Sequence, residues 1–238
     1  GWALSAFSWP APIMLGRAKT CMEYVISLLG PMWGGAQVTL KLFVITMALS
    51  IPLGLVLALV RISRLRSLSA AVGAYIWLMR GTPLMLQLLF IYFALPFVPV
   101  IGVRLPDFPS AVVAFALNYA AYFAEIFRAG IQSIDRGQYE GAKVLGLTYG
   151  QTMRRIILPQ MWTRILPPVS NETITLVKDT SLIYVLALND LLRVARGMVQ
   201  RDFTFTPFIV AGCFYLGMTL ILTWVFQYLE RRHARFDA

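Results

Sequence analysis

Among the stretches of the 238-residue chain that contain no Asp, Glu, Lys or Arg, four stand out, and they cover residues 42–60, 81–103, 108–124 and 203–229. A helix that crosses the hydrocarbon core of a bilayer, roughly 30 Å thick, needs about 20 mostly apolar residues, so each stretch is long enough or nearly so. A fifth, weaker stretch at 156–177 is interrupted by Arg164, Glu172 and three prolines. Because backbone inside lipid must satisfy its own hydrogen bonds, the sequence predicts an all-α polytopic membrane protein with about five transmembrane helices.

The composition excludes most soluble functions. Charged residues make up 13% of the chain and hydrophobic residues 58%, whereas about a quarter of a soluble domain is charged. Two cysteines, Cys21 and Cys213, and one histidine, His233, exclude a disulfide framework, a structural zinc site and a histidine-based catalytic triad. The net charge of +10 comes from basic residues that punctuate apolar runs, so it indicates membrane orientation and no nucleic-acid partner.

The basic residues predict a topology with the N-terminus outside and the C-terminus in the cytoplasm. Three connecting or terminal regions that this topology places in the cytoplasm hold most of them: Arg61, Arg64 and Arg66; Arg128, Arg136, Lys143, Arg154, Arg155 and Arg164; Arg231, Arg232 and Arg235. One region fits less well, because Lys178, Arg193 and two further arginines then lie outside, where three aspartates largely balance them.

Residues 1–32 include a charge-free stretch, 1–16, that contains two prolines and has no basic residue before it. Neither a signal peptide nor a spanning helix fits this pattern. We therefore expect an extracytoplasmic or interfacial N-terminal segment over residues 1–32.

The connection between the third and fourth expected spans is organised as two short helices at an angle. Glu140, Lys143 and Val144 fall on one helical face, Ala142 and Leu145 fall on another, and Gly146 follows where a left-handed residue would end the helix. A second turn from about Tyr149 leads to Pro159, a residue that the first turn of a helix tolerates.

The same connection carries a motif. Six residues reproduce the spacing E-A-A-x3-G-x9-I-x-L-P, namely Glu140, Ala142, Gly146, Ile156, Leu158 and Pro159. This spacing resembles the signature loop of permease subunits in binding-protein-dependent ABC importers. Gly141 departs from the pattern, which usually has a first alanine there, and a helical glycine costs about 1 kcal/mol relative to alanine.

Further segments resemble the branch of that family that takes up polar amino acids of the histidine, arginine, glutamine and glutamate type. They are GAQVTL at 35–40, RGTP at 80–83 followed by Gln87, EIFR at 125–128 and KDTSL at 178–182. The resemblance covers about residues 33–231, which we take as the transmembrane domain, and leaves 232–238 as a basic cytoplasmic tail.

The resemblance implies a coupling helix that inserts into a groove on a cytoplasmic ATPase subunit. Its expected residues are Glu140, Gly141, Ala142, Lys143, Gly146 and Leu147. The alternative is a solvated amphipathic loop. Since the chain has no G-x-x-x-x-G-K-[ST] motif, it needs no cofactor of its own, and we expect a partner to bind ATP and Mg²⁺ and to hydrolyse the nucleotide.

The expected assembly is an importer in the bacterial inner (plasma) membrane. Its other parts would be two copies of the ATP-binding subunit, a second permease that is identical or homologous, and an extracytoplasmic solute-binding protein. The competing hypothesis is a self-contained secondary transporter or channel, which predicts internal repeats that the sequence does not show. A membrane enzyme would need a nucleophile and base or metal ligands at membrane depth, which one terminal histidine does not provide.

Polar residues within the expected spans are the candidates for substrate contact. Asn118, Tyr122 and Glu125 form one helical stripe, and Glu172 follows a pair of prolines in the fourth span. The predicted substrate-binding residues are Glu172, Asn118, Tyr122, Asn171 and Thr175. A carboxylate there would suit the ammonium or guanidinium group of a cationic amino acid.

Each candidate has a structural alternative. Glu125 can pair with Arg128, with or without Arg80, and Glu172 can pair with a basic residue of a neighbouring helix. Asn118 can form an interhelical hydrogen bond. Beyond the fourth span, Lys178, Asp179, Thr180 and Ser181 are expected to form an external gate, and the alternative is an ion-paired turn.

Overall fold

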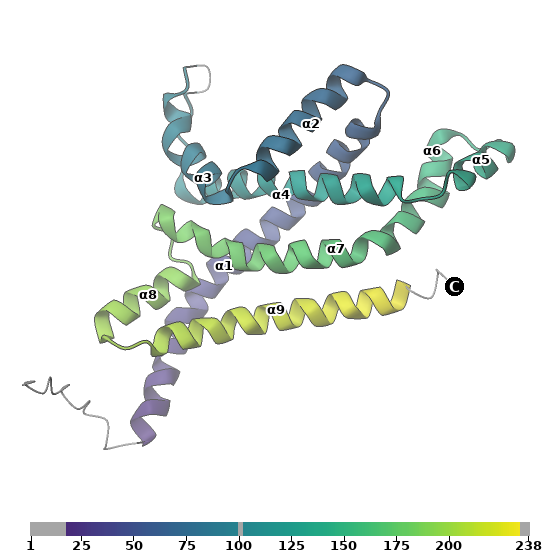
Figure 1. Ribbon diagram of the computed structural model, residues 1–238. Coiled ribbons are helices and arrows are strands. Elements are labelled where there is room, and N and C mark those ends of the chain that lie inside the picture. The colour runs from purple at the N-terminus through teal and green to yellow at the C-terminus, as the bar shows by residue number, and fades with distance from the viewer. Residues whose placement is uncertain (1–17, 100–101, 234–238) are drawn as a thin grey trace, which may run out of the picture.

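The computed structural model describes residues 18–99 and 102–233, and this part of the chain is helical without strands. The first helix, α1 (Ala18–Ile62), is 45 residues long, which corresponds to about 68 Å. Because that length exceeds the roughly 30 Å of bilayer hydrocarbon, part of α1 extends beyond it. In Figure 1, α1 crosses behind the other helices.

Residues 18–32 of the segment expected at 1–32 form the first part of α1, which continues through residue 32 without a break, and an extracytoplasmic or interfacial location of this segment stays a prediction. Leu28 and Met32 are buried there against α8 (Leu191–Asp202), and this apolar contact supports a helix that the sequence pattern did not reveal. Residues 1–17 of the segment lie outside the described residues, as do residues 234–238 of the expected basic tail. Arg232 and His233 belong to the last helix, α9 (Thr206–His233).

The second expected span, 81–103, does not form one helix. Its first residue, Gly81, ends α2 (Arg66–Gly81), and the chain then bends by 106° into α3 (Leu84–Leu89). A π-helical turn, η1 (Phe90–Ala94), and a 3-10 turn, η2 (Leu95–Phe97), complete this arm. Pro83 lies in the bend and favours the break for two reasons. It has no backbone N–H to continue the hydrogen bonds of α2, and it favours the extended backbone seen at the preceding Thr82.

The centre of the fold is α4 (Asp107–Gln132), which packs against α1, α2, α3 and α7 (Leu158–Asp179). Phe115, Tyr119 and Phe123 are almost fully buried on it. Gly54 lets α1 approach α4 closely, since a Cβ there would lie 2.8 Å from Cβ of Phe123. Ala58, one turn later on α1, is fully buried. Gly54 and Ala58 are thus two small residues four positions apart, a spacing that lets helices pack closely.

Between α4 and α7 lie the two short helices expected from the sequence, α5 (Arg136–Val144) and α6 (Tyr149–Thr152), followed by a π-helical turn, η3 (Met153–Ile157). After α7, a 3-10 helix, η4 (Thr180–Leu186), leads to α8. In Figure 1 the α5–α6 pair, the α1–α2 connection and the end of α9 lie toward the right, whereas α8 lies at the left. This arrangement is the one that the expected topology requires, and the orientation in the membrane stays a prediction.

Three helices of the described chain are long and apolar enough to cross a membrane: Met22–Ile62, Asp107–Gln132 and Thr206–Arg232. The bent pair α2 and α3 makes a fourth candidate. The weaker expected span at 156–177, the fourth in chain order, corresponds to α7, whose Arg164, Glu172 and prolines lower its hydropathy. The total of five spans therefore stays a prediction.

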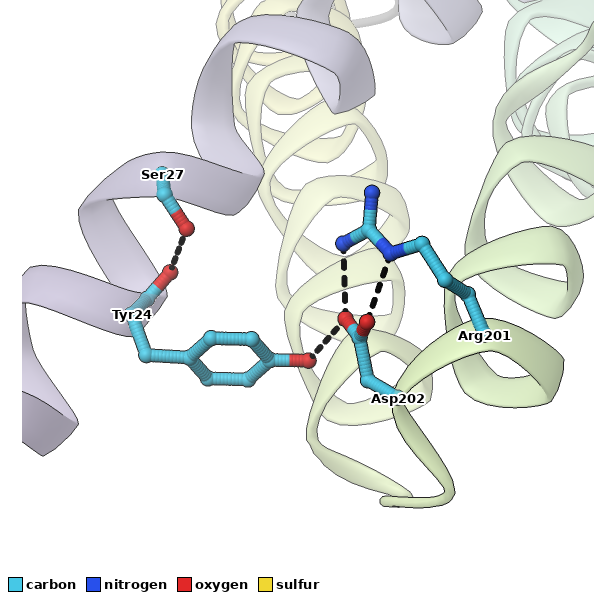
Figure 2. A network of polar contacts seen from close by, with 4 residues as sticks. All are labelled: Tyr24, Ser27, Arg201 and Asp202. Atoms are coloured by element: carbon cyan, nitrogen blue, oxygen red, sulfur yellow. Dashed lines mark hydrogen bonds and ion pairs between the residues drawn. The ribbon is translucent and has the colours of Figure 1, made fainter.

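Polar contacts fasten the start of α1 to the end of α8 (Figure 2). The Tyr24 hydroxyl donates a hydrogen bond of 2.7 Å to Oδ2 of Asp202, and the Arg201 guanidinium donates two to the same carboxylate. These bonds lower the pKa of Asp202 to about 2, with Arg201 contributing first and Tyr24 second. The N-terminal part of α1 is thereby tied to a segment 178 residues away in sequence.

Candidate functional site

A pocket of about 470 Å³ lies between the α2–α3 bend, α4 and α7, and we call it the upper pocket. Its lining is Arg80, Gly81, Thr82, Pro83, Leu84, Asn118, Tyr119, Tyr122, Glu172, Thr175 and Asp179. Four of the five predicted substrate-binding residues therefore face one cavity. The fifth, Asn171, is exposed on α7 and does not line it.

The bend beside the pocket is held by side-chain amides. Nε2 of Gln87 donates to the Met79 carbonyl at 2.9 Å and to Oγ1 of Thr82 at 2.7 Å. Nδ2 of Asn118 donates to the same Met79 carbonyl and to Oε1 of Gln87, each at 3.0 Å. These bonds satisfy a carbonyl that the end of α2 leaves without a helical partner. The RGTP segment and the glutamine that follows it thus form one structural unit.

Two roles are expected for Asn118, substrate contact and interhelical hydrogen bonding, and the structure contains the second. Both protons of its amide nitrogen are donated in the bonds to Met79 and Gln87. Asn118 is 3% exposed, although it borders the upper pocket. Its position therefore secures the pocket wall, and a role in binding substrate stays a prediction.

On the opposite wall, Glu172, Thr175 and Asp179 lie along one face of α7. The Tyr119 hydroxyl of α4 donates a hydrogen bond of 2.8 Å to Oδ2 of Asp179. Sequence reasoning assigned Asp179 only to the external gate and missed Tyr119. The spacing of three and seven residues after Glu172, which places Thr175 and Asp179 on the same helical face, was the signal available for Asp179.

Glu125 does not line the upper pocket. It forms an ion pair with Arg128 within α4, and Nε of Arg128 lies 2.9 Å from Oε2 of Glu125. The structural alternative for Glu125 is therefore confirmed. Arg80 makes no ion pair within 4.0 Å in the described part of the chain, and its guanidinium carbon lies 5.4 Å from the centre of the Tyr122 ring.

The predicted external-gate residues cluster where α7 passes into η4, at the end of α7 away from α5. Lys178 is exposed, Asp179 reaches the upper pocket and Ser181 is half-buried. Thr180 is fully buried, and its hydroxyl donates to the Val177 carbonyl at 2.6 Å. A gating role for these residues stays a prediction.

At the other end of α7, the α5–α6 pair has the geometry that the sequence predicts. Gly146 adopts φ +73°, and the Leu147 amide donates to the Ala142 carbonyl at 3.0 Å, which closes α5 in a left-handed turn. Thr148 and Gln151 form a reciprocal capping box at the start of α6.

The exposed surface of this pair carries both charged and apolar side chains. Glu140, Gly141 and Lys143 are exposed, Ala142 is buried and Leu147 is half-buried. Leu145 does not share the buried face of Ala142 as expected, because α5 ends at Val144 and leaves Leu145 77% exposed. Three large apolar side chains of this pair are thus exposed, Val144, Leu145 and Tyr149, and exposed apolar surface of this kind is a feature of protein interfaces.

Comparison with known proteins agrees with this geometry. The chain is 41% identical over 199 residues to the arginine transport system permease protein ArtQ of Bacillus subtilis, which covers 83% of this chain and 90% of that protein. It is 38% identical over 207 residues to the L-cystine transport system permease protein TcyB of the same organism, covering 86% and 87%. It is 39% identical over 209 residues to the glutamate/aspartate import permease protein GltK of Escherichia coli, covering 84% and 92%.

Solved structures share the fold. A crystal structure of an amino acid ABC transporter with histidines matches with a TM-score of 0.80 at 35% identity, covering 92% of this chain and all of that one. An inward-facing structure of the methionine transporter MetNI matches with a TM-score of 0.66 at 16% identity, covering 91% and 99%, and it supports the fold alone. Residues 50–235 match the model of the family described as binding-protein-dependent transport system inner membrane component. The chain therefore belongs to this family of permease subunits of ABC importers, as its loop motif indicated, and the secondary transporter or channel is not supported.

Proposed function

We propose that this chain is the membrane-spanning subunit of an ATP-driven importer in a bacterial inner membrane, and that it moves polar α-amino acids by alternating access. ATP is hydrolysed by a partner, of which two copies bind. A second permease, identical or homologous, completes the pathway, and an extracytoplasmic binding protein delivers the substrate. The names of the relatives and of the matching transporter structure support this assignment.

The observation that carries the substrate class is the charge of the upper pocket. It holds two carboxylates, Glu172 and Asp179, and one guanidinium, Arg80. An α-amino acid with a cationic side chain presents two positive groups and one carboxylate, so its charges are complementary to these three. Charge-assisted hydrogen bonds between such groups are about twice as strong as neutral ones.

Glu172 is the first candidate for the cationic side chain of the substrate. Asp179 already accepts the Tyr119 hydroxyl, whereas Glu172 has no hydrogen-bond partner within the described residues. Arg80 is the candidate for the substrate carboxylate, and the Tyr122 and Thr175 hydroxyls line the same pocket as neutral partners. Asn118 supports this wall through the α2–α3 bend, and Asn171 lies outside the pocket.

The remaining expected roles belong to the two ends of α7. Lys178, Asp179, Thr180 and Ser181 close the pathway on the outer side. On the cytoplasmic side, Glu140, Gly141, Ala142, Lys143, Gly146 and Leu147 form the coupling helix, and the exposed Val144, Leu145 and Tyr149 add apolar area for the groove of the ATPase. Residues 33–231 form the transmembrane domain of this assembly.

The test uses the permease–ATPase complex in proteoliposomes without the binding protein, so that the membrane pocket alone selects the ligand. ATPase rates and substrate uptake are measured with L-arginine, L-glutamine or L-glutamate, and a complex whose ATPase cannot hydrolyse ATP is the control. We expect L-arginine to stimulate most and L-glutamate least. Equal rates with all three would refute the pocket assignment, and ATP-independent uptake in the control would refute the importer.

A further inference from the structure

A second pocket of about 420 Å³ lies next to the upper pocket, and we call it the lower pocket. Its lining is Arg80, Tyr122, Glu125, Ile126, Ala129, Gly130, Ser133, Arg164, Ile165, Pro168 and Glu172. Three residues line both pockets: Arg80, Tyr122 and Glu172. The two cavities therefore adjoin at these three side chains.

The pockets follow each other along two helices that lie side by side. Residue numbers on α4 rise from the upper to the lower pocket, and those on α7 fall, so the lower pocket is nearer to α5 and α6 (Figure 1). Tyr119 and Ala129 are ten helical residues apart, which corresponds to about 15 Å along α4. A solute that passes from the upper pocket toward the coupling helix thus meets Arg80, Tyr122 and Glu172.

Among these three side chains, Arg80 occupies the junction. Its guanidinium lies over the Tyr122 ring at 5.4 Å, and it is within electrostatic reach of both Glu172 and Glu125. Glu125 is already paired with Arg128. Glu172 is therefore the carboxylate that Arg80 balances across the junction, without a direct ion pair in the described structure.

The backbone beside Arg80 is fixed, while its side chain is not. The Met79 carbonyl receives hydrogen bonds from both Gln87 and Asn118, and α2 ends at Gly81. The arginine side chain is exposed and is held by one ring contact and by long-range attraction. Because the backbone at Arg80 is fixed and its guanidinium group is weakly held, the side chain can exchange partners without movement of a helix.

We propose that Arg80, resting on Tyr122, is a gate between the upper and lower pockets that a zwitterionic ligand opens by exchanging counter-ions. The ligand cation takes Glu172 and the ligand carboxylate takes Arg80. Arg80 then loses the attraction that holds it across the junction, and the way to the lower pocket opens. This inference rests on the proposed function and adds to it the residue that controls passage between the pockets.

The test measures access across the junction in the assembled importer in membrane vesicles, with Cys21 and Cys213 replaced by serine. One reporter is Leu84→Cys in the upper pocket and the other is Ala129→Cys in the lower pocket. A membrane-impermeant thiol reagent is added from the face that carries α5 and α6, without ligand. We expect Arg80→Ala to speed labelling of the upper reporter about two- to fivefold, the factor expected for the loss of one exposed cation–π contact.

In Arg80→Lys the upper reporter should be labelled at nearly the rate seen with arginine at position 80. In Tyr122→Leu it should be labelled as fast as in Arg80→Ala, although the arginine is still present. Arg66→Ala, on the same helix but far from the pockets, is the matched control. The lower reporter should label equally in all variants, which checks that the fold is intact. An unchanged labelling rate at Leu84→Cys in both Arg80→Ala and Tyr122→Leu would overturn the gate. Failure of the proposed function would appear separately, as absence of ATP-driven L-arginine uptake by the wild-type complex.

Discussion

The close crossing of α1 and α4 at Gly54 gives a prediction about stability. In Gly54→Ala the new Cβ would lie 2.8 Å from Cβ of Phe123, 3.1 Å from the Ala120 carbonyl oxygen and 3.1 Å from the Ala124 nitrogen. Two of these atoms are backbone, so neither can move aside as the end of a side chain does. Overpacking of this kind costs about 1–3 kcal/mol, and the better helix propensity of alanine returns about 1 kcal/mol.

Gly34→Ala is the matched control, because Gly34 lies on the same helix and a Cβ there meets nothing within 4 Å. It should gain helix propensity without the steric cost. The two variants should therefore differ by about 2 kcal/mol, which corresponds to a difference on the order of 4–8 °C in the unfolding midpoint of the purified chain in detergent. Equal midpoints for Gly54→Ala and Gly34→Ala would show that α1 and α4 do not pack as closely as described.

Two further predictions concern the ends of helices. Asp190 caps α8 outside the candidate spans, and burial raises the pKa of its carboxyl group from 3.8 to about 6. Between these two pH values the folded state binds a proton that the unfolded state has released. The stability that this proton contributes is therefore fully present below pH 3.8 and is lost as the pH rises through 6. The free energy of unfolding should therefore fall by an amount on the order of 2–3 kcal/mol as the pH rises from about 4 to about 6.5. Asp190→Asn keeps the cap and should flatten this pH dependence, and an unchanged pH dependence in the variant would refute the assignment. At Gly146, where φ is +73°, alanine costs about 1–2 kcal/mol in the left-handed turn, so Gly146→Ala should lower uptake more than ATP hydrolysis. Gly150→Ala is the control, because a Cβ at Gly150 meets nothing within 4 Å. An equal ratio of uptake to ATP hydrolysis in the two variants would show that the α5–α6 turn does not couple hydrolysis to transport.

The sequence predicted best those features that local spacing determines. The left-handed turn at Gly146, the short helices around it and the Glu125–Arg128 pair all depend on residues within one or two turns of each other. The family motif lies in the same region, which explains why the assignment to permease subunits was available from the residues alone.

Features that depend on distant contacts were not predictable in the same way. The helix through residue 32 depends on burial of Leu28 and Met32 against α8, which lies more than 150 residues away in sequence. The bend after Gly81 interrupts a charge-free run whose composition alone is compatible with one straight span. Asp179 lines the upper pocket and accepts a hydrogen bond from the hydroxyl of Tyr119, which lies 60 residues away in sequence on α4.

The central claim is that the carboxylate of Glu172 binds the cationic group of the substrate, and Glu172→Gln tests it most directly. The measurement is the dissociation constant of L-arginine and of L-glutamine for the purified permease–ATPase complex, in wild type and variant. A hydrogen bond to a charged group contributes about 1.5–3 kcal/mol, so the variant should bind L-arginine about 10- to 100-fold more weakly and L-glutamine nearly as before. Unchanged binding of L-arginine by Glu172→Gln would contradict the account.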